Sequence, residues 1–218
     1  MCKLTLTCLM MIALSGTAFA NPIIYVGNVM GASATIHAPG TLADNRTVNY
    51  GAMAVSGDLG VFETYCVDLL HYISPGNWFT VDPLDSMSNW NIGPGSGTRA
   101  AWLYNNYWQG AVGNNTVRAG LQLAIWNVLW DTDDNVLGGS GFWVTSGATG
   151  ADQANTMLAA LNNYHGLLGD AAWLRIPDRD GYTQDLIGPQ PVPEPATMLL
   201  LGTGLLFSAR IARRRTSK

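Results

Sequence analysis

Residues 116–130 read TVRAGLQLAIWNVLW and place apolar side chains on nearly every face of a helix with about 3.6 residues per turn. A helix that is apolar nearly all round has to be covered by the rest of its domain. Thr116 is a candidate N-cap, because a threonine hydroxyl can accept a hydrogen bond from a free amide of the first turn. We therefore expect 116–130 to be the buried central helix.

The neighbouring segments predict that strands surround a block of helices. Residues 98–108 and 151–168 carry apolar residues at helical spacing, with Thr98 as a second candidate N-cap and Gly169 at the expected end of the later helix. The alternating segments 34–37, 47–50 and 62–69 precede this block, and the candidate closing strands 172–176 and 182–187 follow it. Strands, then helices, then strands predict an α+β fold: a β-rich domain with a helical insertion.

The first twenty residues have the organisation of a secretory signal peptide. Lys3 precedes an apolar core at 4–14, and Ala18-Phe19-Ala20 is the small-x-small pattern that signal peptidase accepts. We expect cleavage after Ala20, which would leave residues 21–188 as the exported domain.

Residues 189–218 predict a linker, a membrane helix and a basic tail. Pro193-Glu194-Pro195 precedes an apolar stretch at 196–209, which would cover about 21 Å of a hydrocarbon layer roughly 30 Å thick. The basic residues that follow favour a cytoplasmic end by the positive-inside rule; they are Arg210, Arg213, Arg214 and Arg215. The precursor should therefore be tethered to the inner membrane through this helix.

This tail resembles the PEP-CTERM sorting signal of Gram-negative bacteria, in which Pro-Glu-Pro, one hydrophobic helix and a basic end occur together. The resemblance implies recognition by an exosortase, a membrane transpeptidase. It also implies delivery to the cell surface or to the extracellular exopolysaccharide matrix.

The composition of the exported part excludes some partners. Residues 21–193 contain fourteen acidic residues, five arginines and no lysine. Such an acidic chain argues against nucleic acid as a partner, because phosphate binding requires a basic surface.

No cofactor or metal site is expected. The histidines, His37, His71 and His165, lack metal-ligand spacing. The acidic segment 131–135 lacks the glycine and the glutamate of a calcium loop, since Val136 and Phe142 stand at those positions. We expect this segment to be a solvated helix end.

Cys66 and Gln122 are the candidate functional residues. Cys66 is the only cysteine that remains after removal of the leader. The segments Tyr65-Cys66-Val67-Asp68 and Leu121-Gln122-Leu123-Ala124-Ile125-Trp126 resemble the two signatures of the thioester domains of bacterial surface adhesins. The resemblance implies that the Cys66 thiolate displaces ammonia from the Gln122 amide, and that an amine-bearing surface macromolecule later displaces the sulfur. Trp126 and Trp130 would lie on the helix face of Gln122 and shield the bond.

Two other interpretations remain open. Cys66 can be an inert buried residue of a non-covalent structural protein of the exopolysaccharide matrix, since free cysteine is among the most buried residue types. A cysteine hydrolase would need a histidine base, and His71 would project from the opposite face if the strand continued, while His165 could approach only through the fold. The thioester interpretation predicts single-use attachment, and so not an enzyme.

Overall fold

The structure is a computed structural model. It describes residues 23–29, 31–57, 60–82, 95–166, 168, 171–175, 184–189 and 203–204. The expected signal peptide, the Pro193-Glu194-Pro195 motif and the basic residues Arg210, Arg213, Arg214 and Arg215 lie outside the described residues. Within the described part of the chain, no helix has the length and apolar character needed to cross a membrane.

Six strands form a closed barrel in the order β1-β4-β5-β9-β8-β6, in which all neighbouring strands are antiparallel. They are β1 (Ile23–Asn28), β4 (Met53–Gly57), β5 (Gly60–Cys66), β6 (Trp78–Asp82), β8 (Ala172–Arg175) and β9 (Leu186–Gly188). A separate sheet has the order β3-β2-β7, with β2 (Ala32–His37), β3 (Arg46–Tyr50) and β7 (Trp143–Val144).

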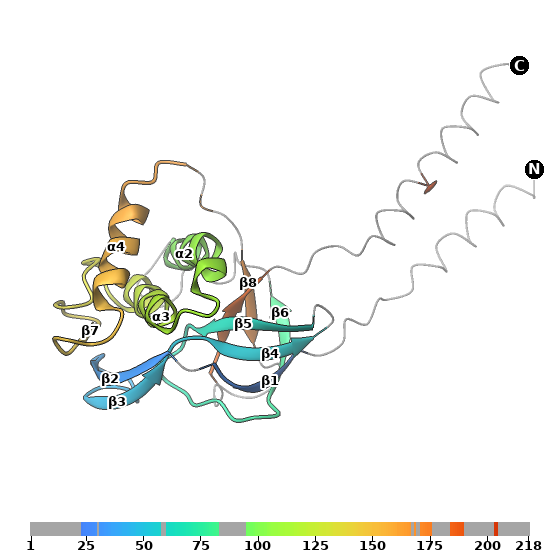
Figure 1. Ribbon diagram of the computed structural model, residues 1–218, viewed down its shortest axis with the longest axis horizontal. Coiled ribbons are helices and arrows are strands. Elements are labelled where there is room, and N and C mark those ends of the chain that lie inside the picture. The colour runs from blue at the N-terminus through green and yellow to red at the C-terminus, as the bar shows by residue number, and fades with distance from the viewer. Residues whose placement is uncertain are drawn as a thin grey trace, which may run out of the picture.

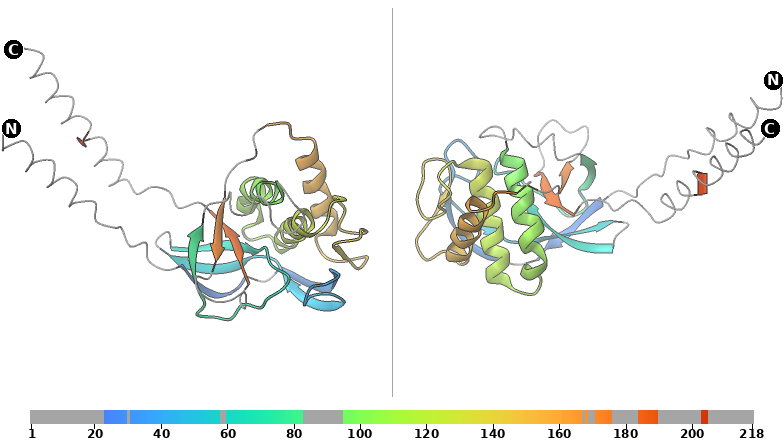
Figure 2. Two further views of the ribbon diagram at one scale, coloured as in Figure 1. Left: turned by 180° about the vertical axis from the view of Figure 1, so that it is seen from behind. Right: turned by 90° about the horizontal axis from the view of Figure 1, so that it is seen from above.

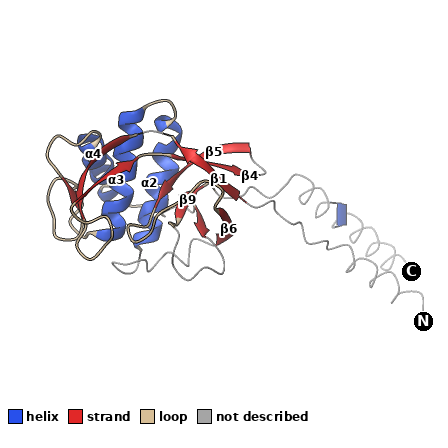
Figure 3. Ribbon diagram, turned by 90° about the horizontal axis from the view of Figure 1, so that it is seen from below, coloured by secondary structure: helices blue, strands red, loops and turns tan. Residues whose placement is uncertain are grey.

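In the chain, the helices are inserted between two barrel strands that pair with each other. α2 (Ser96–Ala111), α3 (Asn115–Trp130) and α4 (Ala151–Asn162) all follow β6 and precede β8, yet β6 and β8 are neighbours in the barrel. The helices gather on one side of the strands (Figures 1 and 3). The helical block is thus an insertion in a β-rich domain, and the predicted α+β fold class is confirmed.

α3 is the central helix, as its sequence predicts. Residues 118–129 are all buried, and α3 packs between α2 and α4 while it also contacts β5, β2 and β3 (Figure 2). Gly120 permits the close approach of α4, because a Cβ atom there would lie 2.7 Å from Cβ of Gln153 and 2.9 Å from the Gly150 carbonyl oxygen. This packing fixes the positions of the buried side chains at 118–129.

Both predicted threonine caps are wrong. α2 begins at Ser96 after Gly95, and the Thr98 hydroxyl donates to the Gly95 carbonyl oxygen instead of accepting an amide. α3 begins at Asn115, and its N-cap is Asn114, whose side chain accepts the amide of Val117 at 3.2 Å. Asparagine is a stronger N-cap than threonine, so the helix starts one residue earlier.

The boundaries of three further elements also differ from those that the sequence predicted. α4 ends at Asn162 and not at 168, since Asn163 caps it. β5 ends at Cys66 and not at 69, because the following residues turn to bind the segment before β9. β9 starts only at Leu186, and the earlier expected residues 182–183 lie outside the described residues.

Candidate functional site

Cys66 and Gln122 lie against each other in the core. Cys66 is the last residue of β5, Gln122 lies in the middle of α3, and both are fully buried. The Cys66 amide donates to Oε1 of Gln122 at 2.9 Å, and Nε2 of Gln122 donates to the Cys66 carbonyl oxygen at 2.7 Å. The Gln122 carboxamide therefore pairs with Cys66 as the backbone of a neighbouring strand would.

The Cys66 thiol is held by one residue close in sequence. Sγ donates to the Asp68 carbonyl oxygen at 2.8 Å and accepts the Asp68 amide at 3.3 Å. Burial raises the pKa of this thiol well above its ordinary value, and the charge of Asp68 raises it further. The hydrogen bond with Asp68 acts in the opposite direction but is the weaker effect. The free thiol is therefore neutral at physiological pH.

The turn after Cys66 is fixed by distant parts of the chain. Trp130 Nε1 donates to the Val67 carbonyl oxygen at 3.2 Å, and the Val67 amide donates to the Asp185 carbonyl oxygen at 3.0 Å. Gln184 Nε2 donates to the Asp68 carbonyl oxygen at 3.0 Å. Sequence reasoning missed Gln184, because only the closed barrel brings residues 184–185 beside β5.

Trp126 covers the pair, whereas Trp130 anchors the turn. The Trp126 indole is buried and packs against Tyr50 and Phe142. Its N–H meets no hydrogen-bond geometry with any described residue, so it is a near neighbour of the thiol and not a donor to it.

A cavity of about 390 Å³ leads from the surface to Gln122. At its inner end lie the buried residues Gln122, Trp126 and Tyr50, whereas Tyr72 and Leu42 at the other end are 63% and 47% exposed. Cys66 is not among the lining residues. A molecule that enters from solvent thus meets the Gln122 side chain and not the thiol.

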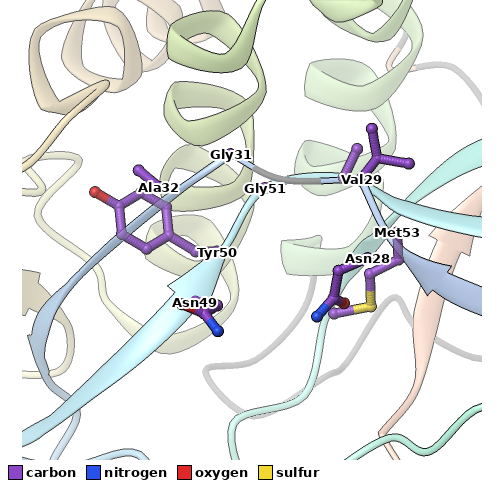
Figure 4. A pocket seen from close by; sticks show the side chains of 9 residues that line it. Asn28, Val29, Gly31, Ala32, Asn49, Tyr50, Gly51 and Met53 are labelled. Atoms are coloured by element: carbon purple, nitrogen blue, oxygen red, sulfur yellow. The ribbon is translucent and has the colours of Figure 1, made fainter.

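A second hollow nearby is too small for an organic ligand. It lies where β1 passes into β2 and β3 passes into β4, has a volume of about 20 Å³, and is lined by residues such as Asn28, Tyr50 and Met53 (Figure 4). About 10–15 Å³ is the space that one water molecule needs. The larger cavity is therefore the candidate ligand site.

His71 lies closer to the pair than the sequence indicated. The chain leaves the strand after Cys66, so the prediction that His71 projects from the opposite strand face does not apply. His71 Nδ1 lies 2.5 Å from Oδ2 of Asp68, and the ring lines the large cavity. Among the described residues, the thiol's hydrogen bonds go to Asp68 and not to a histidine.

Asp131 departs from the predicted solvated helix end, whereas Thr132, Asp133 and Asn135 of the same segment are exposed as predicted. Asp131 is 3% exposed, and its carboxylate accepts the amides of Thr132, Gly141 and Phe142 at 2.6, 2.8 and 2.8 Å. Those bonds close the loop after α3. In the described part of the chain, no cluster of three His, Cys, Asp or Glu residues has a geometry that could hold a metal.

Comparisons with known proteins identify a sorting motif in the C-terminal tail and find a structural similarity for the domain. No curated protein matches the chain. The structure is similar to the N-terminal thioester domain of a surface protein from Clostridium perfringens, with 15% identity, a TM-score of 0.42, and coverage of 65% of this chain and 89% of that chain. A cysteine-to-alanine mutant of that domain gives 16% identity and a TM-score of 0.40, with the same coverage.

Residues 191–215 match the PEP-CTERM protein-sorting motif. This motif includes Pro193-Glu194-Pro195 and the basic residues through Arg215, as the sequence predicted. The chain is therefore an exported, membrane-associated precursor that an exosortase processes.

Proposed function

We propose that residues 21–188 form an exported domain that stores an internal thioester between Cys66 and Gln122. The domain uses this bond once, to attach covalently to an amine-bearing partner. The observation that carries the proposal is the contact itself: the Gln122 carboxamide makes two hydrogen bonds to Cys66, and both residues are fully buried. β5 and α3 hold these two residues side by side, and such positioning favours a reaction between them.

The contact between Gln122 and Cys66 also places a hydrogen-bond donor, the Cys66 amide, where it favours formation of the thioester. Attack of Sγ on Cδ of Gln122 places negative charge on Oε1, which already accepts the Cys66 amide. A backbone donor aimed at that oxygen acts as an oxyanion hole. The Sγ–Cδ bond forms, the Cδ–Nε2 bond breaks, and the thiol proton leaves with the nitrogen as ammonia.

Formation of the thioester leaves a buried acceptor without its donor, and the free-energy cost of that unpaired group keeps the bond reactive. With ammonia lost, the buried Cys66 carbonyl oxygen loses the donor that Nε2 provided. An unsatisfied buried acceptor costs about 1–3 kcal/mol.

The composition of the domain suits an amine as the target. Residues 21–193 contain no lysine, so the domain offers no side-chain amine of its own to the bond. After transfer, the acyl group stays on the partner's nitrogen and the thiol is free, so each molecule reacts once. Such a protein is not an enzyme and needs no cofactor.

The setting that we propose is the surface or the extracellular matrix of a Gram-negative cell. The precursor would be held in the inner membrane by the helix at 196–209, with exosortase acting at the sorting motif. Released or anchored, the domain would then act as an adhesin towards a surface macromolecule or the exopolysaccharide matrix.

A non-covalent matrix protein is the second candidate function. Its support is that the same two hydrogen bonds also satisfy a structural glutamine, and that the neutral thiol is satisfied by Asp68. In that case Cys66 and Gln122 would only join the barrel to α3.

Labelling with a fluorescent primary amine distinguishes the two candidate functions. The purified exported protein should incorporate the amine at Gln122, as mapped by peptide mass spectrometry, and Cys66→Ser should incorporate none because it lacks the nucleophile. The amount of free Cys66 thiol should rise in proportion to the amount of incorporated amine. A wild-type protein that stays unlabelled while folded would favour the matrix protein.

A further inference from the structure

The large cavity joins solvent to the acyl group of the proposed thioester. Its walls near Gln122 are aromatic and aliphatic, with Tyr50, Trp126 and Leu69 all buried. Its volume of about 390 Å³ falls in the range of small-molecule sites, roughly 300–1,000 Å³. These walls fit a slender aliphatic stem, and the inner end presents Gln122 to whatever the stem carries.

His71 lines this cavity and is paired with Asp68, which does not line it. The His71 side chain is 27% exposed, whereas the Asp68 carboxylate that holds its Nδ1 is 3% exposed. A carboxylate accepts hydrogen bonds only, so Nδ1 donates, and in the neutral imidazole the lone pair then lies on Nε2. No hydrogen bond joins Nε2 to any other described residue. The other charged or titratable groups that line the cavity are Arg46, Tyr72 and Tyr50. Arg46 donates to the Tyr72 hydroxyl at the surface end, and the Tyr50 hydroxyl donates to the Thr149 carbonyl oxygen.

The position of Asp68 links this couple to the thioester. The same residue accepts the thiol through its backbone and holds His71 through its side chain. Its Oδ1 also accepts the Leu70 amide at 2.6 Å, which fixes the carboxylate in place. The histidine is thus positioned by the turn that also positions the sulfur.

We propose that the cavity is the entry site for a primary amine on an aliphatic stem, such as a lysine side chain, and that His71 is the general base that removes its proton. This inference rests on the thioester proposed above. An alkylamine has an ordinary pKa of about 10.4, so about one molecule in 2,500 is unprotonated at neutral pH. A base in the same cavity takes the proton from the bound amine, so the abundant ammonium form can enter the site.

The steps balance without another reactant. The ammonium gives one proton to Nε2 of His71, and the free amine then attacks Cδ of Gln122. The new C–N bond forms as the Cδ–Sγ bond breaks, and the amine's second proton moves to the sulfur to give the neutral thiol. His71 then releases its proton to water through its exposed edge. One ammonium and one thioester become one amide, one thiol and one proton.

Two nucleophiles of different basicity test the assignment in the purified exported protein. Methylamine is mostly protonated at neutral pH and needs a base, whereas hydroxylamine is mostly free base and does not. We expect His71→Gln to slow methylamine incorporation by about 10²-fold, the lower end of general-base effects, and to change hydroxylamine incorporation by less than about threefold. Asp68→Asn should slow methylamine in the same selective way, because an amide no longer fixes the His71 tautomer.

His37→Gln is the matched control. His37 stacks on Trp143 in the other sheet and does not line the cavity, so both rates should match the wild type. Equal slowing of both nucleophiles by His71→Gln, or no slowing of either, would overturn the role of His71. A His71→Gln protein that never loses ammonia would also overturn it, since His71 would then act in making the bond. Absence of the thioester from the wild type would instead reject the proposed function.

Discussion

Replacing Gln122 by methionine should destabilise the protein by removing two buried hydrogen bonds at once. Both partners, the amide and the carbonyl oxygen of Cys66, belong to a fully buried residue, so water cannot replace the lost groups. Each unsatisfied group costs about 1–3 kcal/mol, so the free energy of unfolding should fall by about 2–6 kcal/mol. Methionine has a similar volume, which keeps the cavity contribution small.

The measurement is urea unfolding in a Cys66→Ser background, in which the proposed covalent bond cannot add to the difference. The control is Asn127→Leu on the same helix. Asn127 is also fully buried, but neither of its side-chain polar atoms has a partner among the described residues. Replacing an unsatisfied amide by an apolar group should be neutral or stabilising. Equal effects of the two substitutions would refute the reasoning that Gln122 pairs with the Cys66 backbone.

Three further predictions follow from the sequence and the structure. Removal of residues 192–218 should move the protein from the membrane fraction to the soluble fraction, and persistence in the membrane would place the anchor elsewhere. Asp131→Ala should lower the free energy of unfolding by about 3–5 kcal/mol, because three amides lose their acceptor; a thermal shift below about 5 °C would contradict this. In amine-treated protein, the raised pKa of Cys66 means that the unfolded chain ionises first, so stability should fall as pH rises above the ordinary thiol pKa of 9.0. Cys66→Ser should lack this extra fall in urea titrations across pH.

The sequence was sufficient for the fold class and for the placement of the central helix. An apolar run such as 116–130 can only be stable when covered, and period-two alternation before Cys66 indicated its strand. These signals are local, so they can be recognised in the sequence without knowledge of the tertiary structure. The pairing of Cys66 with Gln122 needed the family resemblance, because no local pattern says which helix faces which strand.

The residues that the sequence did not reveal act over long distances or against local preference. Gln184 reaches Asp68 only because β9 closes the barrel beside β5. His71 meets Asp68 because the strand ends early, which alternation alone does not show. Asp131 resembled a solvated helix end, yet the returning loop buries it as an acceptor for backbone amides.

The mass of the folded, untreated domain tests the central claim most directly. Formation of the bond between Cys66 and Gln122 expels one ammonia and nothing else, so the protein should be lighter than its sequence by that amount. Methylamine should then add its full mass, because opening the thioester releases no atom, and should give an N-methylamide at Gln122 and one alkylatable Cys66. A folded domain at its full calculated mass, with Cys66 alkylatable only after unfolding, would contradict the thioester.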